Sequence, residues 1–340
     1  NRGEPTFDAL WSYGLAQFLQ RRSPPSTNRL VIVRLDDDLT RTNTTGGRAY
    51  SRTNYLRLLE RTAKASAIFF DISFEGDSPN REDDIILGRA MKTNHGLVFI
   101  AEYLARTSQG LARGDRTQPL CPTIQDAATP VVANLWEPDN QPIRRLVSRF
   151  ENPSHVAAAW QIARSAHVVN APRDLEDWLW LNYRGSDHPA FPTLSLAQAE
   201  HKESDFFAGL FVLVGDFSDT GRHLRRADHH KNIFGETMHG VEYHALALDN
   251  LLEKAYWSNL CRSWSALISV FWGLIVFVGT PDQRPRRPIV ILVGAILVLG
   301  LGFVLPWVLR LVWPWIFPLS LPLATGLILL PPRPIPPPPC

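Results

Sequence analysis

The sequence predicts an α/β fold: a mixed, largely parallel sheet flanked by helices, followed by three transmembrane helices. Strand-like apolar runs alternate with helix-like segments, which is typical of parallel strands joined by helical crossovers. Charged residues are spread through residues 1–262, whereas residues 263–340 are overwhelmingly apolar. We therefore expect one extracytoplasmic domain over 1–259, membrane spans within 260–330 and a proline-rich cytoplasmic tail over 331–340.

The predicted strands are short apolar runs rich in β-branched and aromatic residues. They are Leu30–Leu35, Ala67–Ile72, Gly96–Ala101 and Phe207–Val214. Apolar residues at helical spacing predict the helices that separate and follow these strands. The helices are Tyr55–Lys64, Asp84–Lys92, Pro153–Ala166 and Val241–Lys254. A loop-rich stretch is expected over Thr107–Pro130.

Three long apolar runs near the end of the chain predict the membrane spans. They are residues 260–279, 288–309 and 311–330. At about 1.5 Å rise per residue, each run would cross the roughly 30 Å of bilayer hydrocarbon. Arg284, Arg286 and Arg287 lie between the first two runs, and short arginine-rich loops stay in the cytoplasm. This orientation places the domain on the periplasmic side of the cell membrane.

The third predicted span carries a stripe of prolines at Pro314, Pro318 and Pro322. Proline removes backbone donors and leaves carbonyl groups that lipid cannot satisfy. We expect this stripe to pack against the other spans or against a membrane partner. The alternative is a kinked helix whose free carbonyls are satisfied by local water.

Several segments of the soluble part resemble the type-two CHASE domain, an extracellular sensory module associated with bacterial cyclases and histidine kinases. The segments follow one another in the family's order. They are VIVRLDDDL (31–39), AIFFDISF (67–74), NLWEPDNQPIRR (134–145), LNYRG (181–185), FVLVGDFSDTGRH (211–223) and MHGVEYHALALDNLL (238–252). Arg52 and Asp83/Asp84 also stand where the family has an arginine and an aspartate before helices.

The resemblance covers roughly residues 5–255, and residues 260–330 match the three spans that usually follow this domain. It implies a sensory input module. The family usually has an N-terminal span and continues into a kinase, cyclase or other effector, whereas ten residues follow Leu330 here. We therefore expect an input module and an anchor without a transmitter, and leave open whether a further segment belongs at either end.

An acidic group is predicted at the carboxyl ends of the strands, where open α/β sheets bind ligands. It consists of Asp36, Asp37, Asp38 and Asp71, with Asp216 at the end of the last strand. Carboxylates there could bind a cation or an amine, or act as an acid/base pair. The complementary polar lining would be Arg52, Asn182 and Arg184. The alternative assigns the aspartates to helix caps and turns, and Arg184 to an ion pair.

Histidines and aspartates near residues 216–244 offer ligand types for a metal, and the candidates are His223, His229 and His244. The spacing lacks the i, i+4 histidine pair of helical zinc sites, so we expect no metal and interpret His244 as a capping or packing residue. Gly215 and Gly221 alone do not form a dinucleotide-binding turn, so no cofactor is expected.

Other features exclude whole classes of function. A formal charge of +2 gives no support for nucleic-acid binding. Cys121, Cys261 and Cys340 form neither a disulfide framework nor a metal motif. A serine-nucleophile motif is missing from the sequence, so no enzyme is predicted.

The prediction is a non-catalytic, membrane-anchored sensory-type binding protein that acts through a protein partner in the membrane. Its other partners would be membrane lipid and, as an option, a small-molecule ligand. Two alternatives remain open. One is an accessory subunit that braces a larger membrane complex, for example a respiratory or photosynthetic one. The other is a metal-dependent hydrolase.

Overall fold

The computed structural model describes fourteen stretches of the chain. They are residues 29–35, 40–42, 48–94, 97–106, 112–116, 119–135, 145–146, 156–167, 179–183, 191–217, 229–232, 237–256, 258–259 and 311–312. The chain divides into two compact units. One is Gln20–Tyr256, and the other combines Asn1–Leu19 with Trp257–Cys340.

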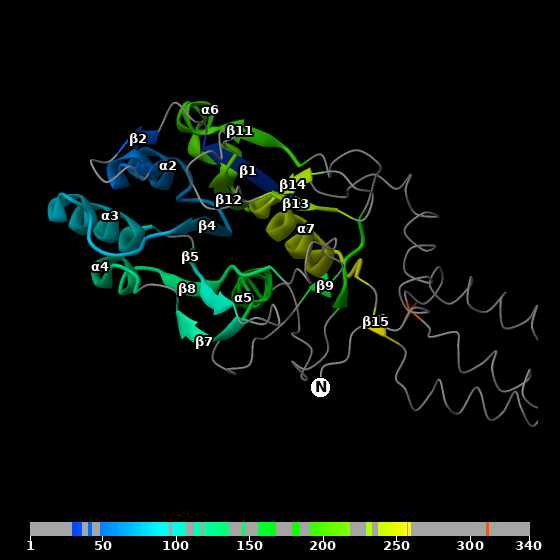
Figure 1. The fold of residues 1–340 in the computed structure, drawn as a ribbon. Coiled ribbons are helices and arrows are strands. Elements are labelled where there is room, and N and C mark those ends of the chain that lie inside the picture. The colour runs from blue at the N-terminus through cyan, green and yellow to red at the C-terminus, as the bar shows by residue number, and fades with distance from the viewer. Residues whose placement is uncertain are drawn as a thin grey trace, which may run out of the picture. The chain divides into compact units, whose positions relative to one another are not determined.

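A six-stranded sheet forms the centre of the unit Gln20–Tyr256, with strand order β11-β1-β12-β4-β5-β8 (Figure 1). Its strands are β1 (Leu30–Leu35), β4 (Ala67–Ser73), β5 (Leu97–Glu102), β8 (Thr129–Val132), β11 (Thr193–Ser195) and β12 (Phe211–Asp216). Every neighbouring pair in this sheet is parallel. The predicted α/β fold with a mostly parallel sheet between helices is therefore confirmed.

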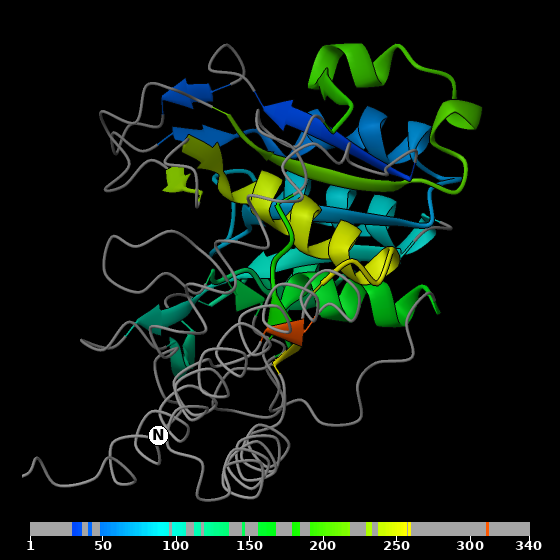
Figure 2. The same ribbon diagram turned by 90° about the vertical axis from the view of Figure 1, so that its right-hand side faces the viewer.

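Helices cover both faces of the sheet. They are the 3-10 helix η2 (Arg52–Tyr55), α2 (Leu56–Arg61), α3 (Arg81–Thr93), α4 (Pro122–Gln125), α5 (Ala158–Ser165), α6 (Leu196–Glu200), the 3-10 helix η3 (Ser204–Phe207) and α7 (Gly240–Leu252). In Figure 1 α2 and α3 lie on one side of the strands, and α5 and α7 lie on the other. Figure 2 looks onto the second face, with the yellow α7 in front of the sheet and the blue helices behind it.

The strand order explains this division of the helices. Crossovers between parallel strands are right-handed, so the direction in which the chain moves along the sheet decides which face its helix covers. The chain moves one way from β1 to β4, β5 and β8, and α2, α3 and α4 cover one face. It moves back from β8 to β11, and α5 covers the opposite face, where α7 joins it after β12.

Side chains of each strand alternate between two apolar cores, as the pleat of a strand requires. In β4, Ala67 and Phe69 belong to the core beneath α5 and α7. Ile68 and Phe70 belong to the core beneath α2, α3 and α4. Both faces are buried, which explains why the strands are continuous apolar runs in the sequence.

The helix α7 is buried along its whole length, because every residue except the half-buried Glu242 is buried. Its start is fixed by Glu242, whose carboxylate accepts a hydrogen bond of 2.8 Å from the backbone N–H of His239. Gly215 in β12 allows α7 to approach the sheet closely. A Cβ atom at that position would lie 2.7 and 2.9 Å from the two γ-methyl groups of Val241, and closer still to its Cβ.

Short two-stranded ladders lie outside the main sheet. Four antiparallel ladders belong to the unit Gln20–Tyr256: β2 (Thr40–Thr42) with β3 (Arg48–Tyr50), β6 (Leu104–Arg106) with β7 (Ala112–Arg116), β9 (Arg145–Leu146) with β10 (Leu179–Trp180), and β13 (His229–Lys231) with β14 (Thr237–His239). In the other unit, β15 (Ser258–Asn259) pairs in parallel with β16 (Leu311–Val312).

Several predicted boundaries differ from the structure. The strand expected over Phe207–Val214 is β12 and begins at Phe211, because η3 and a left-handed turn at Gly209 (φ +73°) precede it. The helix expected over Pro153–Ala166 is confined to α5. The stretch expected to be loop contains β7, α4 and the start of β8.

The three predicted membrane spans lie almost entirely outside the described residues, as do Pro314, Pro318 and Pro322. The third span was expected to begin at Leu311, but Leu311–Val312 is the strand β16, so a helix does not start there. Within the stretches that the structure describes, no helix has both the length and the apolar character needed to cross a bilayer.

Candidate functional site

The carboxyl edge of the sheet at β1 and β12 is a topological switch point. After β1 the chain continues to α2 on one face, and after the neighbouring strand β12 it continues to α7 on the other. In open α/β sheets, adjacent strands whose connections leave on opposite faces create the crevice in which ligands bind. The topology therefore favours the ends of β1 and β12 as the candidate site.

Asp216 is the predicted site residue that the structure places at this switch point. It is the last residue of β12, is half-buried, and pairs in register with Leu35 at the end of β1. Asp36 and Asp37 follow Leu35 directly in the sequence but, like Arg184, lie outside the described residues. Of the aspartates predicted at this position, Asp216 is therefore the one that the structure describes.

Asp71 lies on the α5–α7 face of the sheet, in a polar cluster that joins β4 to α7. The hydroxyl of Tyr103 donates a hydrogen bond of 3.1 Å to Oδ1 of Asp71. Nε2 of His244, on α7, lies 3.7 Å from the same carboxylate oxygen and 3.1 Å from the carbonyl oxygen of Ala133. The His244 ring also contacts the edge of Phe69 at a centroid distance of 5.3 Å. Both Asp71 and His244 are buried.

Arg52 lies on the opposite face of the sheet, so the structure does not bring it together with Asp71. Its Nε is 2.9 Å from Oδ1 of Asp84 in α3, and its Nη2 donates a hydrogen bond of 2.8 Å to the carbonyl oxygen of Gly76. The guanidinium group also stacks over Phe74, 5.5 Å from the ring centroid. Arg52, which belongs to η2, therefore links this helix to α3 through Asp84 and to the loop after β4 through Gly76.

Asn182 is buried beside the end of α7, where its backbone and its amide group make hydrogen bonds. Its backbone N–H donates to Oδ1 of Asn250 at 2.7 Å, and Nδ2 of Asn250 donates back to the Asn182 carbonyl at 3.1 Å. The amide of Asn182 in turn donates to the carbonyl of Ala255 at 3.1 Å. These bonds hold the chain after β10 to α7, away from the switch point.

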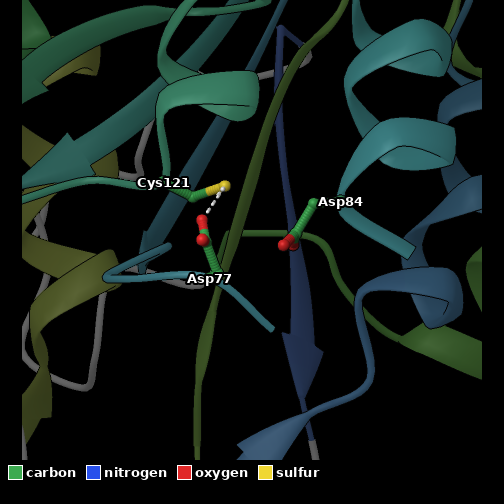
Figure 3. Close-up of side chains that lie close together, drawn as sticks. All are labelled: Asp77, Asp84 and Cys121. Carbon is green, nitrogen blue, oxygen red and sulfur yellow. Dashed lines mark hydrogen bonds between the residues drawn. The ribbon is translucent and has the colours of Figure 1, made fainter. Parts of the chain in front are cut away.

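A third cluster lies where the loop after β4 meets α3 and α4 (Figure 3). Among the described residues it is the one group of potential metal ligands whose ligand atoms lie within 4.8 Å of one another, and it consists of Asp77, Asp84 and Cys121. The thiol of Cys121 donates to Oδ1 of Asp77 at 3.6 Å, and the N–H of Ser78 donates to Oδ2 of Asp84 at 2.8 Å.

The side chains of this cluster contact one another and neighbouring groups of the protein. Burial raises the pKa of the Cys121 thiol above its ordinary value, and the nearby Asp84 carboxylate raises it further. A protonated thiol is a poor nucleophile and a poor metal ligand. Arg52 already neutralises Asp84. The three side chains therefore secure the loop after β4 rather than present a reactive group.

The predicted histidine candidates do not join this cluster. His244 is buried, and its Nε2 lies 3.1 Å from the carbonyl oxygen of Ala133. His229 belongs to β13, where it pairs with His239, and only its backbone is described. His223 lies outside the described residues.

Tyr103 and Asn250 were missed by the sequence interpretation, although both contact predicted site residues. Tyr103 lies two residues after the predicted strand Gly96–Ala101, and that position was the available signal. Asn250 offers no such signal, because a single asparagine in a helix more often faces solvent than the core.

Comparison with known proteins gives one match. The family model described as the CHASE2 domain matches residues 5–280. No match was found among curated proteins or among solved structures. CHASE2 domains are typically extracellular sensory domains, and this match agrees with the resemblance of the six segments described above. The chain belongs to the CHASE2 domain family.

Proposed function

We propose that this protein is an extracytoplasmic sensory protein, anchored in the membrane, which binds a small ligand and acts without catalysis through a protein partner. The observation that carries the proposal is the CHASE2 match over residues 5–280, because it assigns a sensory role to the whole unit that contains the sheet. The apolar runs over residues 260–330 support the anchor and the periplasmic placement.

The ligand site of this proposal is the switch point at the carboxyl ends of β1 and β12. Asp216 stands there in register with Leu35, and the sequence continues from Leu35 into Asp36 and Asp37. Carboxylates gathered at one edge of the sheet favour a positively charged ligand. We therefore propose that the ligand is a small amine or a divalent cation.

The helix α7 would carry the signal away from this site. Its first turn packs against Gly215, next to Asp216, and its last turn leads the chain toward Ser258 and the apolar runs. A helix is a rigid element, so a displacement at its first turn is passed to its last turn. A partner protein would read the change in the segment that follows α7.

Ligand binding is tested on the full chain purified in mild detergent. The thermal unfolding temperature is measured with a panel of primary amines, quaternary amines, Mg²⁺ and Ca²⁺. A ligand that binds only the folded state stabilises it by about 2.7 kcal/mol at a concentration of 100 times Kd. We expect at least one member of the panel to raise the unfolding temperature in a saturable manner.

Asp216→Asn should weaken that binding by about tenfold or more, since the loss of a charged hydrogen-bond partner costs roughly 1.5–3 kcal/mol. The matched control is Asp205→Asn, an exposed aspartate in η3, just before the amino end of the same strand. The site proposal fails if no member of the panel stabilises the protein, or if both variants bind equally well.

Membrane anchoring and orientation are tested separately in spheroplasts, in which the outer membrane no longer shields the periplasmic side. A membrane-impermeant protease should degrade the unit Gln20–Tyr256 while the arginine-rich loop at 284–287 stays protected. Digestion of that loop with the unit intact would reverse the proposed orientation.

A further inference from the structure

We propose that the outer surface of α2 and α3 is a docking surface for an acidic, partly apolar segment of a partner protein. Four basic residues and one apolar residue define this α2–α3 surface, and all five are exposed: Arg57, Arg61, Ile86, Arg89 and Lys92. The inference goes beyond the proposed function, which assigns a partner only to the segment that follows α7.

A hydrogen bond brings the ends of the two helices together. The side-chain amide of Asn94, which caps the end of α3, donates a hydrogen bond of 2.7 Å to the carbonyl oxygen of Leu59 in α2. The two helices lie on the same side of the strands (Figure 1). Their exposed side chains therefore belong to one surface of the protein.

Positive charge predominates on this surface. Residues 56–64 and 86–94 carry five basic side chains and one acidic side chain, all of them exposed. Lys64 pairs with an aspartate of η3, whereas no described carboxylate lies within ion-pairing distance of the other four cations. Nε of Arg61 donates to the carbonyl oxygen of Glu200, a neutral acceptor that leaves the charge of the arginine in place. These cations favour a negatively charged partner.

An exposed isoleucine stands among the cations. Ile86 is 36 % exposed and lies one turn before Arg89 on α3, so the two side chains share a face of the helix. Protein interfaces combine a buried apolar centre with a polar rim and are enriched in arginine. A partner that covers Ile86 brings its carboxylates to Arg57 and Arg89, and arginine binds a carboxylate through two parallel hydrogen bonds.

The position of this surface favours a protein partner over a bilayer. The helices α2 and α3 cover one face of the sheet, whereas the chain leaves the sheet after α7, on the other face (Figure 2). The α2–α3 surface is thus turned away from the point at which the chain leaves the unit Gln20–Tyr256. A soluble segment of another protein reaches such a surface directly.

The test measures the binding of synthetic peptides to the full chain purified in mild detergent. Three labelled peptides of equal length are compared by fluorescence anisotropy: one of glutamate and leucine, one of glutamate and serine, and one of lysine and leucine. We expect the glutamate–leucine peptide to bind most tightly. Its Kd should rise about fivefold or more between about 0.05 M and about 0.5 M salt, because salt screens exposed charges.

Reversal of two charges should weaken this binding. Arg57→Glu combined with Arg89→Glu should raise the Kd about tenfold or more, because repulsion replaces attraction at both positions. Ile86→Ser should raise it about threefold through the loss of apolar contact. The matched control is Arg164→Glu, which makes the same change of charge at an exposed arginine of α5, on the opposite face, and should bind like the wild type.

Equal binding of the acidic and basic peptides by the wild type, or wild-type affinity in the double variant, would overturn the proposal. An equal loss in Arg164→Glu would also overturn it, because net charge alone would then explain the binding. Displacement of the peptide by short-chain phosphatidylglycerol would assign the surface to the bilayer instead.

The thermal unfolding temperature shows whether each variant folds. If the charge reversals unfold the protein, Arg57→Gln with Arg89→Gln takes their place, and the comparison of the three peptides on the wild type still decides. The ligand test at Asp216 involves none of these residues, so failure of the two proposals is distinguishable.

Discussion

Gly215 in β12 and Val241 in the first turn of α7 are in direct contact, and the contact leaves no room for a side chain at position 215. The missing Cβ therefore sets the distance between the sheet and α7. In the sequence, this glycine follows an apolar run without completing a dinucleotide-binding turn. The structure assigns it to helix packing, one residue before the proposed ligand site.

Gly215→Ala should destabilise the unit Gln20–Tyr256 by about 1–3 kcal/mol, the usual cost of overpacking a filled core. Val241→Ala should not rescue it, because the alanine retains the Cβ atom that lies closest to the new methyl group. Val241→Gly should rescue it in part. Chemical denaturation of the three single variants and the two double variants measures these energies, and simple additivity of Gly215→Ala and Val241→Gly would contradict the contact.

Asn250→Ala should cost at least about 2 kcal/mol of unfolding free energy, since it leaves buried backbone groups of Asn182 without their partner. The measurement is again denaturant unfolding. The comparison variant is Gln198→Ala, which removes an exposed side chain from the cap of α6 and should cost less than about 1 kcal/mol. Equal losses for the two variants would show that the Asn182–Asn250 pair does not hold α7.

Arg52→Lys should destabilise the protein although the charge is retained, because a lysine cannot bind Asp84 and the Gly76 carbonyl in the same planar arrangement. Breaking a buried ion pair costs about 3–5 kcal/mol when one partner is left behind. Asp84→Asn should have an effect of similar size, and the double variant should be less than additive.

The exposed pair of Lys64 and Asp205 provides the contrast. Lys64→Ala should change the unfolding free energy by less than about 1 kcal/mol, because solvent screens surface ion pairs. A cost for Arg52→Lys no larger than that of Lys64→Ala would mean that the buried pair does not stabilise the loop after β4.

We expect the unfolding free energy to fall at alkaline pH because of the Cys121 thiol. Its pKa is raised above the ordinary value of 9.0 by burial, so the unfolded chain releases this proton at a lower pH than the folded protein does. The folded state then binds more protons than the unfolded state, and the unfolding free energy falls as the pH rises above 9.0. Below that value the thiol is protonated in both states and contributes no slope.

Urea unfolding between pH 8 and pH 10 measures this slope. Cys121→Ala should remove part of it, whereas Cys261→Ala serves as the cysteine control. An identical pH dependence in the wild type and in Cys121→Ala would show that the thiol is not held protonated by the fold.

The long elements of the fold were predictable because local pattern and burial agree in them. Leu30–Leu35 is apolar at nearly every position, and a strand buried on both faces requires such a run. The helix α4 and the strand β8 were not predicted, since each is only four residues long and gives no periodic signal. Their placement follows from packing against α3 and β5.

The predicted site residues lie on two faces of the sheet, which the sequence did not distinguish. The rule that ligands bind at the carboxyl edge led to Asp216 and Asp71. The assignment of residues to one face or the other depends on strand order, which the sequence did not give. Arg52 and Asp71 therefore appeared to be neighbours, although the sheet separates them.

The burial of α7 on all sides bears on how the helix tolerates substitution. A surface helix accepts changes at every third or fourth position, where its side chains meet water. In α7 the one residue that is not buried, Glu242, already caps the helix. A saturation mutagenesis profile of Gly240–Leu252 should accordingly be uniformly intolerant, without the helical repeat that such profiles normally display.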